Sequence, residues 1–256
     1  MSERGAVIDA LFPDRVADLG DDELLALYGP VDRSVPRLRA NFIASVDGSA
    51  TAAGLSGELG APADKRVFDL QRQVADVVVV AAGTVRSEGY GAMRLGPEAE
   101  AWRVAAGLAA QPAFALVSRS LDLDPASDVF AVAPVRPLVL TSDSAPADRR
   151  AALEDVADVI SCGATGVEPS RLVDVLVARG LLQMHCEGGP SLLGSLIEAD
   201  ALDALALTVS PNLEGGQGTR ITHPSGDAAP LDLRALALDH VLNSDGMLLL
   251  HYSRRR

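Results

Sequence analysis

The sequence predicts an α/β protein whose mixed, mostly parallel sheet ends in antiparallel strands. Two observations support this prediction. Short apolar runs alternate along the chain with segments of helical periodicity, which is the pattern of repeated βαβ units. Near the C-terminus, by contrast, two apolar segments flank Asn243-Ser244-Asp245-Gly246, a sequence typical of a β-hairpin.

The individual elements follow in chain order. Strands are expected over residues 38–46, 76–82, 113–117, 137–141, 156–161, 182–187 and 202–209, with hairpin strands over 231–242 and 247–252. Residues 76–82 form a nearly continuous β-branched run, as in strands buried on both faces of a parallel sheet. Helices are expected over 62–75, 147–153, 171–178 and 191–197. The first of these begins at Pro62, because proline is favoured at the first helical position.

The first 36 residues differ in pattern from the rest of the chain. They contain an apolar stretch from Val7 to Phe12 and an acidic Asp21-Asp22-Glu23 that leads into several leucines. We expect one or two short helices here, packed on the outside of the main domain. The domain prediction is therefore a helical N-terminal extension over 1–36 and one larger domain over 37–256.

The composition excludes two classes of partner. Of the 256 residues, 48% are hydrophobic and 22% are charged, which suits a globular chain with a sizeable core. The longest apolar runs are far shorter than the ~20 residues needed to cross a bilayer, so no membrane association is expected. The net charge of −13 repels nucleic acid. An anionic ligand must therefore be bound by backbone N–H groups and a few arginines.

Neither a signal peptide nor a metal site is expected. Cys162 and Cys186 lie far apart and the N-terminus has no apolar signal core, which predicts a cytoplasmic protein with reduced thiols. His185-Cys186-Glu187 matches half of the zinc-deaminase pattern, but the Pro-Cys-x-x-Cys half is absent. The Gly-x-Gly-x-x-Gly and P-loop patterns are absent as well.

Ligands of parallel α/β sheets collect at the carboxyl ends of strands, and one strand end stands out. There the chain reads Glu187-Gly188-Gly189-Pro190-Ser191-Leu192. Gly189 and Pro190 suit the start of a helix whose first N–H groups are free, and two residues without Cβ let a diphosphate approach the backbone. The alternative interpretation is an ordinary glycine-containing turn.

Two other strand ends combine hydroxyl groups with arginine. One carries Gly83, Thr84 and Arg86, and the next carries Ser118 and Arg119. A phosphomonoester such as the 2′-phosphate of NADPH is bound well by an arginine beside short hydroxyl donors. The alternative is a surface arginine paired with a neighbouring carboxylate.

Two acids lie close to the same predicted sheet edge. Asp47 follows the strand at 38–46, and Asp64 falls in the first turn of the next helix. Either could take part in proton transfer or bind a substrate. The alternatives are that Asp47 forms a turn and that Asp64 complements the helix dipole.

Taken together, five motifs resemble the reductase domain of riboflavin biosynthesis, the pyrimidine reductase family, which shares the dihydrofolate reductase fold. They occur in order at residues 41–48, 80–86, 117–120, 187–193 and 210–216, within a match over about 38–252. The resemblance implies a three-layer fold with helices on both faces of the sheet, and it makes residues 37–256 the reductase domain. It also implies a homodimer.

The resemblance further implies an NADPH-dependent oxidoreductase. Its substrate would be 5-amino-6-(5-phosphoribosylamino)uracil, whose open-chain imine accepts hydride at the ribose C1′. Carried over by position, the cofactor would contact Gly83, Thr84, Arg86, Ser118, Arg119, Glu187, Gly188, Gly189, Pro190, Ser191 and Leu192. The substrate would contact Asn41, Ser45, Asp47 and Asp64, with Asp64 and Asp47 as the catalytic acids.

The chain differs from the bifunctional riboflavin enzyme in lacking the deaminase half. The substrate therefore stays open between the riboflavin pyrimidine and a pterin such as dihydrofolate. A non-catalytic NADP(H)-binding protein is a third possibility. The proton could come from Asp47, Asp64 or water, and the sequence does not choose among them.

Overall fold

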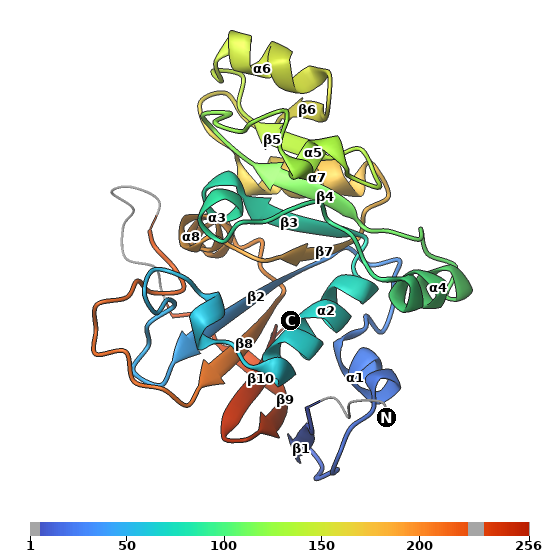
Figure 1. Cartoon of the computed structure of the whole chain (residues 1–256), viewed down its shortest axis with the longest axis vertical. Coiled ribbons are helices and arrows are strands. Elements are labelled where there is room, and N and C mark those ends of the chain that lie inside the picture. Colours follow the sequence, from blue (N-terminus) through green and yellow to red (C-terminus); the bar gives the residue numbers. More distant parts are fainter. Residues whose placement is uncertain (1–5, 225–232, 256) are drawn as a thin grey trace.

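One mixed sheet runs through the computed structural model, which describes residues 6–224 and 233–255 (Figure 1). Within those residues its ten strands lie in the order β1-β9-β10-β8-β2-β7-β3-β4-β5-β6. The strands are β1 (Asp9–Phe12), β2 (Arg37–Ser45), β3 (Val77–Ala81), β4 (Ala113–Val117), β5 (Leu138–Thr141), β6 (Asp158–Ser161), β7 (Gln183–Cys186), β8 (Ala204–Ser210), β9 (Leu236–Ser244) and β10 (Met247–Arg254).

The strand directions confirm the predicted mixed sheet. From β8 through β2, β7, β3, β4 and β5 to β6, every neighbouring pair is parallel. Strand β10 pairs antiparallel with β8 and with β9, so the C-terminal hairpin forms as expected. Part of the predicted first hairpin strand, residues 231 and 232, lies outside the described residues, as do residues 1–5.

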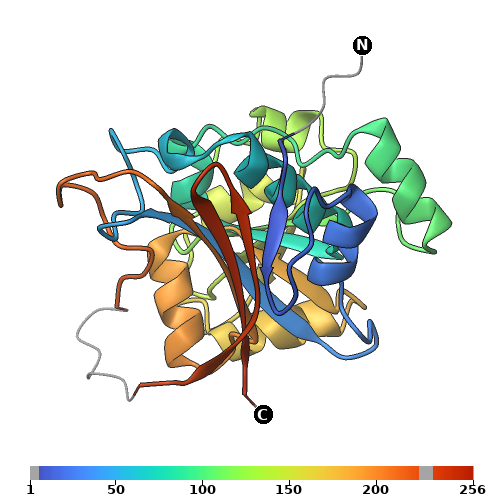
Figure 2. The ribbon, with the colours of Figure 1, turned by 90° about the horizontal axis from the view of Figure 1, so that it is seen from below.

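Helices cover both faces of this sheet (Figure 2). They are α1 (Asp21–Tyr28), α2 (Pro62–Val74), α3 (Ala82–Ser87), α4 (Pro97–Ala105), α5 (Asp128–Ala131), α6 (Ala147–Glu154), α7 (Pro169–Val177) and α8 (Pro190–Glu198), with a 3₁₀ turn η1 (Gly57–Leu59). Helices α7 and α8 bury their apolar side chains on one face. On the other face α1 and α2 cover the antiparallel end, while α3, α5 and α6 cover the parallel end.

The alternation of side chains along β3 explains how one strand supports both layers. Val77 and Val79 belong to the cluster beneath α7 and α8, whereas Val78 and Val80 belong to the cluster beneath α3, α5 and α6. A strand buried on both faces needs apolar residues at every position, which is why this segment is continuously β-branched.

The N-terminal segment, expected to form one or two short helices, contains one helix and one strand. Residues Asp21–Tyr28 form the helix α1, but Asp9–Phe12 form β1, which pairs antiparallel with β9 at the edge of the sheet. A short apolar run is compatible with either element, and pairing with β9 selects the strand. The boundary between an extension and a reductase domain stays a prediction.

A buried aromatic cluster joins α1 to the C-terminal hairpin. The rings of His240 and His251 stack at 5.0 Å, and Tyr28 meets the ring of His240 edge-on at 4.8 Å. His240 is 3% exposed, and burial lowers its pKa to about 4. The histidine is therefore neutral in the folded protein at neutral pH.

This pKa predicts a loss of stability in acid. An unfolded histidine takes up a proton near pH 6.5, whereas folded His240 does so only near pH 4, so protons favour the unfolded chain between these values. Replacing His240 by Phe should make the free energy of unfolding less dependent on pH in this window, by up to about 1.4 kcal/mol per pH unit. Urea titrations at several pH values measure the slope, and equal slopes for both proteins would contradict the prediction.

Candidate active site

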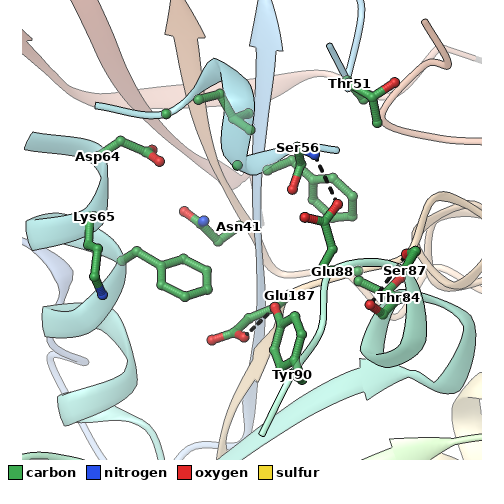
Figure 3. A pocket seen from close by; sticks show the side chains of 18 of the residues that line it. Asn41, Thr51, Ser56, Asp64, Lys65, Thr84, Ser87, Glu88, Tyr90 and Glu187 are labelled. Atoms are coloured by element: carbon green, nitrogen blue, oxygen red, sulfur yellow. Dashed lines mark hydrogen bonds between the residues drawn. The ribbon is translucent and has the colours of Figure 1, made fainter. Parts of the chain in front are cut away.

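A cleft of about 1180 Å³ opens at the carboxyl ends of β2, β7 and β3 (Figure 3). One wall is α2, which carries Asp64, Lys65 and Arg72. The opposite wall comprises α3 and the segment after it, which carry Thr84 and Tyr90. Residues of β2, residues 50–61, the turn between β7 and α8, and Thr219 and His223 after β8 also line the cleft. The cleft therefore lies at the sheet edge where the sequence analysis expected ligands.

The glycine pair forms the turn between β7 and α8. Gly188 has φ +112°, which residues with a side chain rarely adopt, and Gly189 caps α8, whose first residue is Pro190. The peptide between the two glycines is cis. A Cβ on Gly189 would lie 2.5 Å from Oγ1 of Thr84, so this turn and α3 can approach each other only because the residue is glycine.

Glu187, immediately before the glycines, has a fully buried side chain. Arg72 donates to it twice, from Nε to Oε1 at 2.6 Å and from Nη2 to Oε2 at 2.7 Å, and the hydroxyl of Tyr90 donates to Oε2 at 3.0 Å. Burial alone would raise the pKa of Glu187, but the bonds and charge of Arg72 lower it to about 2. The floor of the cleft is therefore an ionised pair with no net charge.

Asp64 on α2 and Asn41 on β2 both line the cleft (Figure 3). Burial raises the pKa of Asp64, against a hydrogen bond with Thr208 that lowers it. The side-chain Oδ1 of Asn41 accepts a hydrogen bond of 2.8 Å from Nε2 of Gln71, a buried residue of α2. An acid with a raised pKa and an amide in the same cleft could bind or protonate a heterocycle.

Ser45 and Asp47 do not reach the cleft. The hydroxyl of Ser45 donates to Asp47 at 2.5 Å, and the same carboxylate accepts the N–H groups of Glu214 at 3.1 Å and Gly215 at 2.8 Å. These bonds lower the pKa of Asp47 to about 2. Ser45 and Asp47 therefore connect the loop after β8 to the end of β2. This contact agrees with the alternative interpretation of Asp47 as a turn residue.

Of the cofactor candidates, the cleft contains Thr84, Glu187, Gly188, Gly189, Pro190 and Ser191. Leu192 is buried in the core beneath α8, and Ser118 is buried at the end of β4. Gly83, Arg86 and Arg119 are exposed and do not line the cleft. Arg86 donates to the backbone carbonyl of Asp122 at 2.5 Å and lies 3.7 Å from the carboxylate of the same residue, as in the alternative of a surface arginine paired with a neighbouring carboxylate.

Several lining residues have no motif in the sequence. Arg72 lies between aromatic rings, 4.2 Å from the ring centroid of Phe68 and 5.7 Å from that of Tyr90. The backbone N–H of Ser56 donates to Glu88 at 2.9 Å and joins the loop at 50–61 to the end of α3 (Figure 3). The helical spacing of α2 could have identified Arg72 as a residue near its buried face, but not its partner, 115 positions away.

Within the described ranges, no helix has the length and apolar character to cross a bilayer, and no group of three or more histidine, cysteine, aspartate or glutamate side chains is arranged to bind a metal. Both cysteines are buried and unpaired with each other.

The sequence has relatives among named reductases. A protein of Methanothermobacter thermautotrophicus is 27% identical over 187 residues, which cover 72% of this chain and 82% of the relative. A protein of Archaeoglobus fulgidus is 26% identical over 183 residues, which cover 71% of this chain and 83% of the relative. Both are named 2,5-diamino-6-ribosylamino-4(3H)-pyrimidinone 5′-phosphate reductase.

Solved structures agree with these relatives. A pyrimidine reductase-like protein from Corynebacterium diphtheriae superposes with a TM-score of 0.82 at 30% identity, covering 91% of this chain and 98% of its own. The riboflavin biosynthesis reductase Rib7 of Saccharomyces cerevisiae superposes with a TM-score of 0.63 at 16% identity, which shows a shared fold. The superposition covers 90% of this chain and 96% of Rib7. The mixed, mostly parallel sheet with helices on both faces, which the resemblance implied, is the architecture observed. Because residues 36–248 match the RibD C-terminal domain, the chain belongs to that family of reductases.

Proposed function

We propose that this chain is an NADPH-dependent reductase of a phosphoribosylaminopyrimidine in riboflavin biosynthesis. The observation that supports it is the match to the reductase family over residues 36–248, together with a cleft that contains the glycine turn. The sequence analysis expected the aminouracil substrate, whereas the names of the archaeal relatives specify the 2,5-diaminopyrimidinone. Both have an aminoribosyl phosphate whose open-chain imine can accept hydride at C1′.

The cofactor side of the cleft fits a dinucleotide phosphate. The amide groups that open α8 have no intrahelical acceptor, and the helix dipole favours an anion there. Gly188 and Gly189 would hold the diphosphate with Pro190 and Ser191, while Thr84 lies against the turn. Ser118 and Arg119, with Gly83 and Arg86, remain the proposed contacts for the adenosine-side phosphates.

The α2 side of the cleft suits the pyrimidine. When bound, NADPH supplies the hydride. The chain would orient the pyrimidine with Asn41 and Asp64 and exclude water with Phe42 and Phe68. As C1′ accepts the hydride, the imine nitrogen takes a proton to become the amine, and we assign its delivery to Asp64 rather than Asp47 because only Asp64 lines the cleft.

Three further expectations remain predictions: preference for NADPH over NADH, a homodimer and a cytoplasmic location. The homodimer comes from the family resemblance alone.

The activity itself is tested by mixing the protein with NADPH and following the loss of its near-ultraviolet absorbance. We expect decay with the diaminopyrimidinone ribosyl phosphate or its aminouracil counterpart, and none with dihydrofolate. Tight NADPH binding without decay on any of these substrates would favour a non-catalytic binder. Decay with dihydrofolate alone would favour a pterin reductase.

Replacing Asp64 by Asn should lower kcat by about 10²-fold, the lower end of the range for a lost general acid, and leave NADPH binding unchanged. Asn keeps the size of the side chain but cannot give up a proton. Stopped-flow reduction rates and fluorescence titration with NADPH measure the two effects. Asp47→Asn is the matched control and should retain kcat, because Asp47 lies outside the cleft lining. An equal fall in both variants would contradict the assignment.

Replacing Gly189 by Ala should weaken NADPH binding at least about tenfold, because the new Cβ would meet Oγ1 of Thr84 at 2.5 Å and displace the turn. Gly166→Ala is the control, since Gly166 lies outside the cleft lining and a Cβ there meets nothing within 4 Å. In the Gly189→Ala/Thr84→Ala double variant the hydroxyl is gone, so part of the binding should return. Failure of the double variant to recover any binding would show that the contact with Thr84 is not the cause.

A further inference from the structure

Two buried ionisable side chains lie behind Glu187, outside the cleft lining. Arg39 on β2 and His185 on β7 are paired in the parallel ladder, and they are 8% and 0% exposed. His185 precedes Glu187 by two positions, so the two side chains lie on the same face of the chain as it leaves β7. His185 therefore lies in contact with Arg39 on one side of its ring and with Glu187, which lines the cleft, on the other.

The contacts of Arg39 determine where the proton of His185 resides. Arg39 donates to the carbonyl oxygens of Tyr28 at 2.6 Å and Gln71 at 3.2 Å. Its Nε and Nη2 each lie 3.4 Å from Nδ1 of His185. Because a guanidinium can only donate, Nδ1 must be the acceptor and carry a lone pair.

A neutral imidazole with a bare Nδ1 carries its hydrogen on Nε2. Burial lowers the pKa of His185 to about 4, so the ring is neutral at neutral pH. Nε2 is buried and forms no hydrogen bond of regular geometry in the described part of the chain, and Oε1 of Glu187 lies 3.4 Å from it. The hydrogen of His185 therefore points toward the buried carboxylate.

Glu187 in turn determines the geometry of the cleft floor. Its oxygens accept from Nε and Nη2 of Arg72 and from the hydroxyl of Tyr90, so the carboxylate is occupied by protein donors. Arg72 is left with Nη1, which has no acceptor among the described residues, and the side chain lines the cleft. A group that binds substrate there would be Arg72, and Glu187 would hold it in place.

We propose that Arg39 and His185 are positioning residues that fix Glu187 and, through it, the guanidinium of Arg72 for binding of the pyrimidine substrate. Arg39 sets the Nε2–H tautomer of His185, and that N–H holds Oε1 of Glu187 in the orientation Arg72 requires. Residues that orient metal ligands from behind change affinity by about 10-fold or more when mutated, and we expect an effect of about that size from these positioning residues. The effect on substrate rests on the proposed function, whereas the tautomer does not.

The tautomer is tested directly in the wild-type protein. Two-bond ¹H–¹⁵N correlation spectra of ¹⁵N-histidine-labelled protein at neutral pH distinguish the two ring nitrogens, and the His185 signals are identified by their absence in His185→Gln. We expect the Nε2–H form. The Nδ1–H form, or a protonated ring, would overturn the proposal irrespective of any activity.

Kinetics on two variants separate positioning from packing. His185→Leu removes both ring nitrogens and should raise KM for the pyrimidine substrate about tenfold, with kcat changed less than about twofold. His185→Gln restores a donor and an acceptor and should recover most of that loss. His240→Leu removes a buried imidazole that does not line the cleft and should leave both constants unchanged.

Equal losses in the Leu and Gln variants would overturn the proposal, since simple packing would then explain them. Should His185→Leu fail to fold, the tautomer and the partial loss in His185→Gln still decide the question. A wild-type protein that shows the Nε2–H form but reduces no pyrimidine would refute the proposed function. The contacts of Arg39 and His185 with Glu187 would still stand.

Discussion

The buried carboxylate of Glu187 is the constraint on which the cleft depends. Removing an ion from water costs several kcal/mol even after relaxation, and this chain carries a net charge of −13. Arg72 offsets the cost with two short charge-assisted bonds, and Tyr90 satisfies a further lone pair. Glu187 precedes the turn that leads into α8, while its partner Arg72 lies on α2 and its partner Tyr90 follows α3. This one ionised group therefore links both walls of the cleft to its floor.

Close packing at the glycine turn is the second constraint. The turn and α3 approach so closely that a methyl group on Gly189 would collide with Thr84, and the ring of Phe42 lies 3.7 Å from where a Cβ of Gly188 would be. A ligand can therefore approach the backbone of this turn only because Gly188 and Gly189 carry no side chains. In a strongly acidic protein, amide groups and a helix dipole can attract an anion without an additional buried charge.

The two acids show how tertiary context separates residues of the same type. Asp64 is desolvated on the wall of the cleft and its pKa is raised, whereas Asp47 is exposed and bonded to three donors, and its pKa is lowered. Both lie near the carboxyl end of β2, so position along the sequence could not distinguish them. The loop after β8 makes the difference, because its N–H groups occupy the carboxylate of Asp47.

Most of the strands, the helices α2, α6, α7 and α8, and the sheet edge at which the cleft opens were determined by the sequence alone, whereas α3, α4 and α5 were not predicted. Apolar periodicity is local, and so the strands of the parallel region, the helix from Pro62 and the C-terminal hairpin could be predicted, as could the approach of Thr84, Asn41 and the glycine turn to one edge. Only the tertiary structure decided that residues 9–12 join the sheet, that Arg72 meets Glu187 and that Asp47 points away. Those outcomes depend on which distant segments become neighbours, since the partners of Glu187 lie 115 and 97 positions away and the strand order departs from the chain order.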